Sequence, residues 1–327
     1  MRKRSIFVLA VVLMSFALMF TGCAQQAAEP VDVRVTAMNG PTAMGMVQFM
    51  SENESGNIKD NNYSFEIAKT IDEALPKVTK GEVDIAAVPA NVSSVLFNNT
   101  KGAVQVLAIN TLGVLYIVEN GETVQSLQDL KGKTIYAAGK GATPEYALTH
   151  ILASNGLDKE VTVEWKSEQT EVVAAVSATE GAVAMLPQPF ATSAQMTNTK
   201  IKTVLDLTKE WDKIDDDSAL VTGVVVVNTE FAKANPSAVE DFMDHYEDSV
   251  EFINEKPSEG AELVVKYGIL PKAPIAEKAI PLCNITCIDD DDDLKPMLSG
   301  YLKVLFDQNP KSIGGAMPTD DFYYNED

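Results

Sequence analysis

The sequence predicts an α/β protein built of two similar lobes, each with a mostly parallel sheet flanked by helices. Strand-like and helix-like segments alternate through most of residues 31–228, an order that produces parallel sheets covered by helices. One pattern also occurs twice, at 81–89 and at 181–187: a glycine ends a helix, a short apolar strand follows, and a proline ends that strand. Chance alone can repeat this pattern in an α/β protein, so it supports two related lobes only together with the alternation.

The chain begins with a segment typical of export signals. A basic stretch at 2–4 precedes an apolar run at 6–20, and Thr21, Gly22 and Cys23 follow directly. The run is too short, and too closely followed by small residues, for a membrane span, so residues 1–22 are predicted to be a signal peptide. An ordinary secretory signal remains an alternative. The small residues before Cys23 favour a lipoprotein signal, which it resembles although Phe20 stands where Leu is usual.

Acylation of Cys23 would anchor the protein to the outer face of the cell membrane. Residues 23–30 would then form a short polar tether. The part after the signal has 327 − 22 = 305 residues, enough for two lobes of ordinary size. Its net charge is −21 − 3 = −24, because the signal carries three positive charges. Such a charge repels phosphate backbones and argues against a nucleic-acid partner.

The segments between the tether and residue 118 supply the elements of one sheet. A helix is expected at 70–81 despite Pro76, and a long extended run follows at 104–118. The expected strands are 31–39, 63–69 and 83–89, and the other expected helices are 40–53 and 90–99.

A second unit follows from residue 126. It opens with a strand, a glycine-rich turn and a helix that ends at Gly156. After the acidic loop at Asp215–Asp217 comes an extended segment at 219–228, and the rest is mostly helical. The other expected strands are 161–166, 182–187 and 202–207, and the other expected helices are 168–181, one starting near 188, 236–256, 258–268 and 294–310.

Three features concern metals and thiols. Cys283 and Cys287 either form a disulfide or are two buried thiols, and the spacing leaves both alternatives open. The two histidines lie on predicted helices far from these cysteines, so we expect no zinc site. The run Asp289–Asp293 lacks the spacing of a calcium loop and is interpreted as a solvated segment that caps the helix from Leu294. No metal or cofactor is expected.

Several segments resemble the type II solute-binding proteins of ABC importers, over nearly the whole exported chain. The similarity is strongest to the branch of receptors for aliphatic sulfonates, taurine, nitrate and thiamine-pyrimidine precursors. In that branch the box at 186–192 commonly has Glu where this chain has Gln188. The segments that carry the resemblance are Asn39–Thr42, VTKGEVDIAAVPAN (78–91), DLKGKTI (129–135), GKGATPEYAL (139–148), LPQPFAT (186–192) and VTGVVVVN (221–228).

The resemblance implies a type II periplasmic-binding-protein fold with two hinge strands, near Leu112–Val118 and Val221–Val227. Closure of the lobes about such a hinge would trap a ligand. The implied partners are a small-molecule ligand and an ABC permease, and we expect a monomer. The implied lobe I comprises 31–112 and 223–327, and the implied lobe II comprises 113–222.

Ligands of open α/β sheets bind beyond the carboxyl ends of the strands, so the turns at these ends hold the candidates. Thr42 and the N–H groups beside it either bind an acceptor or cap a helix. Thr143 is expected to cap the next such helix with Pro144 in its first position, and ligand contact there rests mainly on the resemblance. Phe190 either stacks on a flat ligand or packs in the core. The candidate ligand-binding residues are Asn39, Gly40, Pro41, Thr42, Asn91, Gly141, Ala142, Thr143, Glu145, Gln188, Phe190 and Thr222.

Arginine is scarce, which bears on the ligand. Arg34 is the only arginine after the signal, and it is expected to form a structural ion pair in the first strand. Because arginine is the usual clamp for sulfonate or carboxylate, its scarcity and the amide of Gln188 favour a neutral, cationic or flat heterocyclic ligand over a sulfonate.

A binding protein is the function that the sequence favours. It contains no nucleophile-elbow or zinc-protease motif, so we expect no enzyme activity. The alternatives are a pyrimidine-precursor synthase-like enzyme on the same fold, which would rely on His and Cys-rich segments not visible here, and a surface lipoprotein without a transport role, which would need neither two lobes nor hinge strands.

Overall fold

The computed structural model describes residues 29–214 and 218–325. The signal peptide, Cys23, most of the tether and the acidic loop at Asp215–Asp217 lie outside these residues. Among the described helices, none combines the length and the hydrophobicity that a membrane crossing requires.

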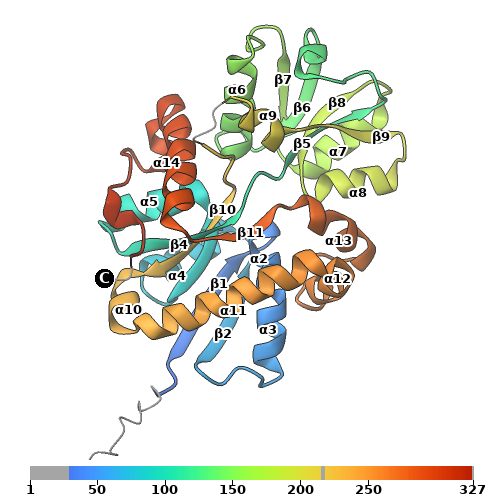
Figure 1. Cartoon of the computed structure of the whole chain (residues 1–327). Coiled ribbons are helices and arrows are strands. Elements are labelled where there is room, and N and C mark those ends of the chain that lie inside the picture. Colours follow the sequence, from blue (N-terminus) through green and yellow to red (C-terminus); the bar gives the residue numbers. More distant parts are fainter. Residues whose placement is uncertain (1–28, 215–217, 326–327) are drawn as a thin grey trace, which may run out of the picture. The chain divides into compact units, whose positions relative to one another are not determined.

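The first sheet has six strands in the order β11-β4-β10-β3-β1-β2. Figure 1 shows its strands in the lower and middle part of the view. The strands are β1 (Asp32–Met38), β2 (Asn62–Ala68), β3 (Ile85–Pro89), β4 (Val104–Thr111), β10 (Gly223–Asn228) and β11 (Ile285–Ile288). The neighbouring helices along the chain are α2 (Pro41–Met44), α3 (Val47–Glu54), α4 (Ile71–Thr79), α5 (Ala90–Thr100), α10 (Thr229–Ala234), α11 (Pro236–Glu255), α12 (Pro257–Lys266), α13 (Ala273–Ala279) and α14 (Asp291–Gln308).

The second sheet has five strands in the order β7-β6-β8-β5-β9. Its strands are β5 (Leu115–Asn120), β6 (Thr134–Ala138), β7 (Thr162–Lys166), β8 (Val183–Pro187) and β9 (Ile201–Asp206). Its helices are α6 (Thr143–Ser154), α7 (Gln169–Ala178), α8 (Phe190–Thr197) and α9 (Leu207–Asp212), and short 3-10 turns η1 (Leu127–Leu130), η2 (Ile280–Leu282), η3 (Pro310–Ile313) and η4 (Asp320–Phe322) complete the chain.

The two sheets share one topology apart from β11. In the first sheet β10 runs antiparallel to β3 and to β4, and in the second β5 runs antiparallel to β8 and to β9. The other neighbouring pairs are parallel except β11 with β4, which is antiparallel, so four strands of each sheet, β1–β4 and β6–β9, point the same way. Both reversed strands follow a passage of the chain from one sheet to the other. A chain that arrives at the carboxyl ends of the parallel strands must enter the sheet against their direction, which explains the reversal.

The repeated sequence pattern falls on equivalent strands. Gly81 and Gly181 both adopt left-handed backbone angles, with φ of 68° and 77°, and precede β3 and β8. Each of these strands is the one that pairs with the reversed strand of its sheet. The fold is therefore a two-lobed α/β structure of the type II periplasmic-binding-protein class, as the sequence predicted. We call the first sheet with its helices lobe I and the second sheet with its helices lobe II, and the predicted lobe boundaries in the chain stay a prediction.

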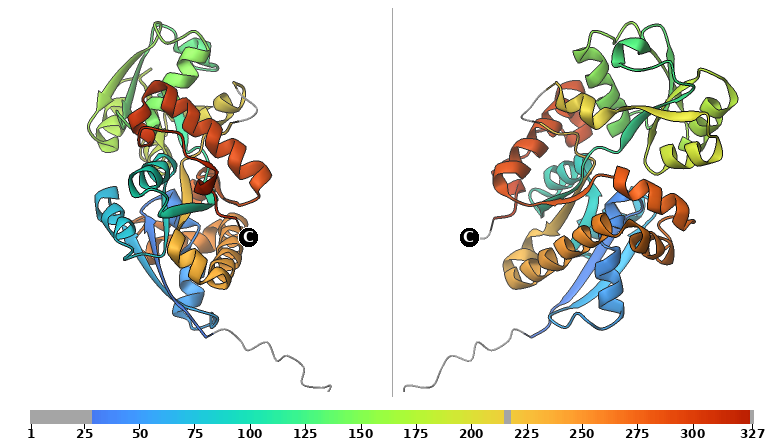
Figure 2. Two further views of the ribbon diagram at one scale, coloured as in Figure 1. Left: turned by 90° about the vertical axis from the view of Figure 1, so that its left-hand side faces the viewer. Right: turned by 45° about the vertical axis from the view of Figure 1, so that its right-hand side comes forward.

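A continuous hydrophobic core runs through both lobes along α14. Its side chains Leu298, Tyr301 and Leu302 are fully buried in a cluster that also contains Val106 of β4 and Ile151 of α6. Figure 2 shows α14 (red) from two further sides. A second cluster lies between the first sheet and α3, α11 and α12, and a third lies beneath α7 and α8.

Three expectations from the sequence change in detail. The extended run at 104–118 is two strands in different sheets, because it passes between the lobes at Leu112–Val114. The last long helix begins at Asp291 instead of Leu294, since the Asp290 side chain accepts a hydrogen bond from the N–H of Asp292. Helix α13 was not expected. It is short and begins with Pro274 in its first turn, so its pattern is weak.

Candidate functional site

The candidate site is the strand-end edge, by which we mean the ends of β1, β3, β4, β6, β8 and β9 together with the starts of β10 and β5. Gly223 at the start of β10 lies opposite both Pro89 and Thr111, so these three residues share one edge of the first sheet. Leu115 at the start of β5 likewise lies opposite Pro187. Only three residues, Leu112–Val114, connect β4 to β5. The edges of the two sheets therefore lie close together at this crossing.

All twelve candidate residues lie on or beside the strand-end edge. In lobe I, Asn39–Thr42 follow β1, Asn91 lies in the first turn of α5 after β3, and Thr222 precedes β10. In lobe II, Gly141–Glu145 follow β6, and Gln188 and Phe190 follow β8. The sequence therefore located this edge. Their role in ligand contact stays a prediction.

Thr42 belongs to a closed polar cluster in lobe I. Its hydroxyl donates to the carbonyl oxygen of Met38 at 2.7 Å, and the residue in the capping position is Gly40, with a φ of 119°. The fully buried Asn110 donates from Nδ2 to the Thr42 carbonyl at 3.2 Å and accepts from the Thr111 hydroxyl at 3.1 Å. Thr42 is therefore not the helix cap that the sequence allowed, because its hydroxyl bonds back to the preceding strand.

Gly223 completes this cluster by its lack of a side chain. A Cβ at this position would collide with Cγ2 of Thr42 and Oδ1 of Asn110. The neighbouring Thr222 is bound through its backbone, since its N–H donates to Thr111 and its carbonyl accepts from the N–H of Ala90. The start of β10 is thereby locked between the ends of β3 and β4.

The other two candidates of lobe I differ in exposure. Asn39 is exposed, and its N–H donates to the carbonyl of Ala68 at 2.9 Å. Asn91 donates from Nδ2 to the carbonyl of Ser312 at 3.2 Å, which ties α5 to the turn after α14. Its amide oxygen accepts none of the described hydrogen bonds, so Asn91 keeps an acceptor for a ligand.

Gln188 is the most unusual residue of the edge. Its side chain is 2 % exposed, and its Oε1 accepts from the hydroxyl of Thr192 at 2.8 Å and from the Thr192 N–H at 3.3 Å. Its Nε2 is buried and has no partner among the described residues. A buried donor without an acceptor costs about 1–3 kcal/mol. Such a group is rare in proteins unless something else supplies the acceptor.

A second unpaired atom lies on the same edge. Thr208, in the first turn of α9, has a buried hydroxyl with no partner among the described residues. This hydroxyl lies against Gly113 in the crossing segment, where a Cβ would collide with it. The sequence analysis missed Thr208, although its position just after a strand that ends in Leu-Asp was a usable signal.

The crossing segment is held from its other side by Asn284. The Asn284 carbonyl accepts from the N–H of Leu112 at 3.0 Å, and its side-chain Nδ2 donates to the carbonyl of Gly113. Asn284 adopts a left-handed φ of 46° that makes both bonds available from one residue. This clamp holds the passage between the lobes, and no local sequence pattern indicated it.

Tyr116 links the lobes beside the edge. Its hydroxyl donates to the carbonyl of Leu282 at 2.8 Å. Burial raises the pKa of Tyr116, and the negative charge of Asp206 raises it further. The phenol is therefore neutral at physiological pH and serves as a donor.

The loop Gly141–Glu145 is bound within the protein. Glu145 accepts from the N–H of Gly141 at 2.6 Å, and Thr143 accepts from the hydroxyl of Tyr301 on α14 at 2.9 Å. Helix α6 begins at Thr143 with Ala142 in the capping position, so the expected cap at Thr143 is wrong by one residue. The reason is that Glu145 satisfies the free N–H of the loop and Tyr301 engages the Thr143 hydroxyl.

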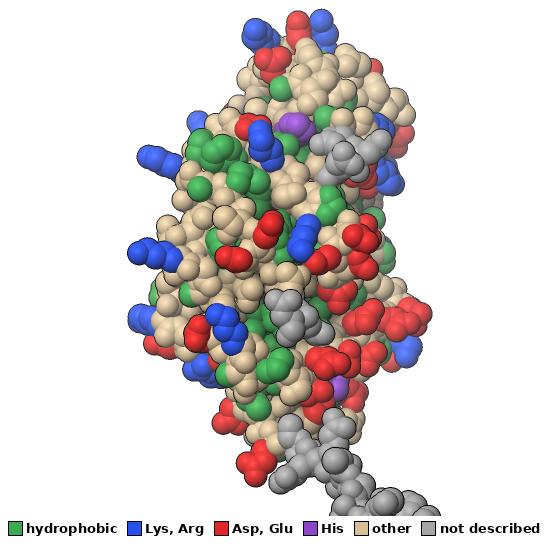
Figure 3. All heavy atoms as spheres, turned by 60° about the vertical axis from the view of Figure 1, so that its left-hand side comes forward, with side chains coloured by type: hydrophobic (Ala, Val, Ile, Leu, Met, Phe, Trp, Pro, Cys, Tyr) green, Lys and Arg blue, Asp and Glu red, His purple; other side chains and the backbone are tan. Residues whose placement is uncertain are grey.

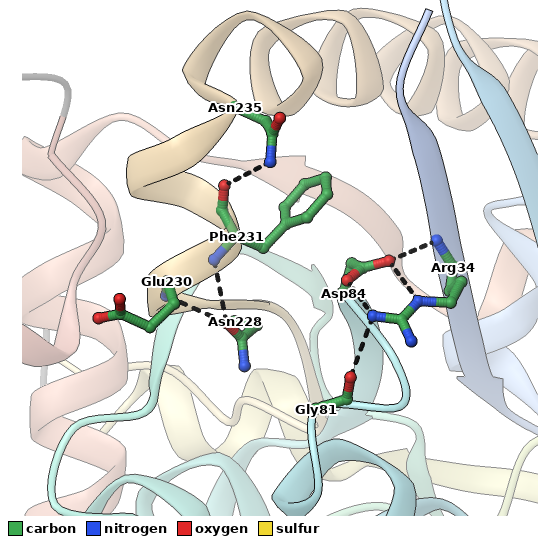
Figure 4. A network of polar contacts seen from close by, with 7 residues as sticks. All are labelled: Arg34, Gly81, Asp84, Asn228, Glu230, Phe231 and Asn235. Atoms are coloured by element: carbon green, nitrogen blue, oxygen red, sulfur yellow. Dashed lines mark hydrogen bonds and ion pairs between the residues drawn. The ribbon is translucent and has the colours of Figure 1, made fainter.

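Phe190 and Arg34 both have structural contacts within the protein. Phe190 is half-buried and packs on the cluster beneath α7 and α8. Arg34 forms the expected structural ion pair with Asp84, with Nη2 to Oδ1 at 2.6 Å and Nε to Oδ2 at 2.8 Å (Figure 4). The hydrogen bond to Asp84 raises the pKa of Arg34. The pair lies at the start of β3, away from the strand-end edge, near the Asn228 cap of α10.

The cysteines are free thiols. Cys283 is buried and Cys287 is partly exposed, so the structure has the thiol alternative and not the disulfide. Burial raises the pKa of the Cys283 thiol to about 12. Within the described ranges, no group of three or more His, Cys, Asp or Glu residues is placed to hold a metal ion.

The strand-end edge thus offers amide and hydroxyl groups to a ligand. Its unpaired buried groups are the Gln188 amide Nε2 and the Thr208 hydroxyl, and the Asn91 amide oxygen accepts none of the described hydrogen bonds. These groups suit hydrogen bonding to a neutral polar molecule, and none of them is charged.

Comparison with known proteins agrees with the class that the fold defines. The family model described as "NMT1/THI5 like" matches residues 59–260, more than half of the chain. The chain belongs to this NMT1/THI5-like family, which confirms the resemblance found in the sequence. No curated protein matches the sequence.

Solved structures show the same fold at low sequence identity. An ABC transporter protein from Parabacteroides distasonis is 22 % identical with a TM-score of 0.74, over 90 % of this chain and 99 % of that one. The periplasmic aliphatic sulphonate-binding protein SsuA of Escherichia coli is 13 % identical with a TM-score of 0.70, over 90 % and 92 %. The alkanesulfonate-binding protein SsuA of Xanthomonas axonopodis pv. citri, bound to MOPS, is 12 % identical with a TM-score of 0.62, over 90 % and 96 %.

Proposed function

We propose that this protein is an extracytoplasmic solute-binding lipoprotein that captures a small organic molecule between its lobes and delivers it to an ABC importer. The observation that carries the proposal is the buried, unpaired Nε2 of Gln188 at the strand-end edge. A ligand oxygen or ring nitrogen that accepts from this group would remove the cost of its burial.

The ligand class follows from the groups at this edge. Gln188 donates, Asn91 accepts, and the one arginine of the described chain is bound to Asp84. An anion would meet no guanidinium there, whereas a neutral, cationic or flat heterocyclic compound with a carbonyl or ring nitrogen would match the free amides.

Binding is favoured over catalysis by the state of the buried cysteine near the edge. Cys283 lies close enough to Tyr116 to affect its pKa, and with its own pKa of about 12 it is protonated at neutral pH. A thiol reacts as its thiolate, so this cysteine would be inert. The proposed export signal, the anchor at Cys23, the ABC permease as partner and the monomeric state complete the proposal and rest on the sequence and the family.

Ligand-induced thermal shifts across a panel of heterocycles, amines and alkanesulfonates test this function. Binding raises the unfolding free energy by RT ln(1 + [L]/Kd), so a true ligand shifts the melting temperature with its concentration. Stabilisation by alkanesulfonates alone, with no response to heterocycles or amines, would contradict the proposed ligand class.

The site itself is tested with Gln188→Ala. We expect the affinity for the identified ligand to fall at least about tenfold, which corresponds to the loss of one buried hydrogen bond. The control is Gln128→Ala, because Gln128 is an exposed glutamine of lobe II on η1. Asn91→Ala is expected to weaken binding as well, with a small loss of stability from the Ser312 contact. Unchanged affinity in both Gln188→Ala and Asn91→Ala would remove these residues from the site.

A further inference from the structure

A crevice of about 400 Å³ opens between the lobes, outside the candidate residues. Thr192 and Met196 of α8 and Lys202 of β9 form its lobe II side, and Lys278 of α13 and Leu282 of η2 form its lobe I side. Helices α8 and α13 are in contact, and Figure 1 shows them facing each other. We call this hollow the α8–α13 crevice.

The α8–α13 crevice gathers exposed apolar side chains. Met196 and Leu282 are each 39 % exposed, and they are the large hydrophobic residues that the described chain leaves exposed. Single exposed apolar residues are ordinary, but here both line the same hollow from opposite lobes. The crevice therefore has an apolar wall on each side.

The crevice is also a positive spot on a strongly negative protein. Neither Lys202 nor Lys278 takes part in the ion pairs of the described residues, and no carboxylate lines the crevice. The chain as a whole has a net charge of −21. On the face in Figure 3, by contrast, Asp and Glu side chains gather in groups. Two unpaired ammonium groups without an acid partner favour an anion between them.

We propose that the α8–α13 crevice binds a small carboxylate with an apolar body. The carboxylate accepts hydrogen bonds from Lys202 and Lys278, and the apolar body lies on Met196 and Leu282. Because each type of contact comes from both lobes, the bound anion holds α8 against α13. This site is separate from the strand-end edge. The proposal does not depend on which ligand the edge binds.

The crevice adjoins the strand-end edge through two hydrogen bonds. Thr192 lines the crevice and donates to Oε1 of Gln188, and the carbonyl of Leu282 accepts from Tyr116. An anion in the crevice would thus lie beside Thr192 and Leu282, which hydrogen-bond to Gln188 and Tyr116 of the neighbouring edge.

Calorimetric titration of the full chain with hexanoate tests the proposal, with hexan-1-ol and hexylammonium as probes of the same body without the negative charge. We expect one equivalent of hexanoate to bind and both other probes to bind at least about tenfold more weakly. Lys202→Gln and Lys278→Gln are each expected to weaken hexanoate about tenfold, the effect of losing one charge-assisted hydrogen bond.

The matched control is Lys272→Gln, an exposed lysine at the other end of α13 that does not line the crevice. It should leave hexanoate affinity unchanged. Absence of hexanoate binding at millimolar concentration, or an equal loss in Lys272→Gln, would overturn the proposal. Loss of hexanoate binding in Gln188→Ala, with binding retained in both crevice variants, would place the anion at the strand-end edge and also overturn it. None of these outcomes bears on whether the strand-end edge binds its own ligand, which the thermal-shift panel tests separately.

Discussion

The two halves of the strand-end edge differ in how their buried polar groups are satisfied. In lobe I, Thr42, Asn110 and Thr111 bond to one another and to the backbone. In lobe II, the corresponding edge leaves Nε2 of Gln188 and the hydroxyl of Thr208 without partners among the described residues. Two sheets of the same topology therefore present one closed edge and one with unused hydrogen-bonding capacity. The difference teaches that two edges of the same topology can satisfy their buried polar groups differently, with lobe I bonding them to one another and lobe II keeping two of them unpaired.

The largest effect on stability is expected from filling the space beside Gly223, on the lobe I side of the strand-end edge. Gly223→Ala places a Cβ against Thr42 and Asn110, where neither side chain has room to move without breaking its hydrogen bonds. We expect the free energy of unfolding to fall by about 3 kcal/mol. Urea denaturation measures it, with Gly141→Ala as the comparison, because Gly141 has open space around it but a left-handed φ of 80°, so its loss reports backbone strain without a collision. Gly223 lacks such a φ, so a loss in Gly223→Ala no larger than that in Gly141→Ala would contradict the packing argument.

A buried carboxylate at the opposite edge of the second sheet sharpens the comparison. Glu119 on β5 is fully buried and accepts from the side chain and N–H of Thr123 and the N–H of Val124. Burial acts to raise its pKa, but these hydrogen bonds and the charge of Lys133 outweigh it, so the pKa lies below the ordinary 4.5. Lobe II is thus not loosely built in general, because this buried charge is fully bonded, although Oδ1 of Asn120 on the same strand and Oε1 of Gln169 on α7 also lack partners among the described residues.

Glu119→Gln is expected to lower the free energy of unfolding at pH 7 by about 1–3 kcal/mol, because the charge-assisted bonds weaken. A lowered folded-state pKa contributes stability that is complete above the unfolded value and is lost as pH falls through the folded value. The difference between Glu119→Gln and the unmodified protein should therefore shrink below about pH 4.5. Denaturation midpoints measured from pH 7 to pH 3 check this, and a constant difference would contradict the assigned ionisation.

The smallest effect comes from a matched pair of threonines. Thr111→Val removes the donor to Asn110 in lobe I and should cost about 1 kcal/mol. Thr208→Val removes a hydroxyl that has no partner, so the stability should stay within about 0.5 kcal/mol or rise. Thermal denaturation of both variants measures this difference in stability. If Thr208→Val lost as much as Thr111→Val, the two edges would not differ as described.

The sequence by itself determined the local elements and the edge. Glycines that adopt left-handed angles before β3 and β8, and prolines that end these strands, act over a few residues, so the repeated unit and the turns at 39–42 and 187–190 were readable. For the same reason the order of strands and helices predicted the two lobes.

Only the tertiary structure decided which polar groups at that edge are already used. Asn110 meets Thr42 across 68 residues, Thr143 meets Tyr301 across 158, and Asn284 meets Gly113 across 171. A hydrogen-bond partner so distant in the chain leaves no local pattern, because it depends on how whole elements pack. For this reason two features became visible only once the two sheets, α13 and α14 were in place. They are the unpaired amide of Gln188 and the presence of Lys202 and Lys278 in one crevice.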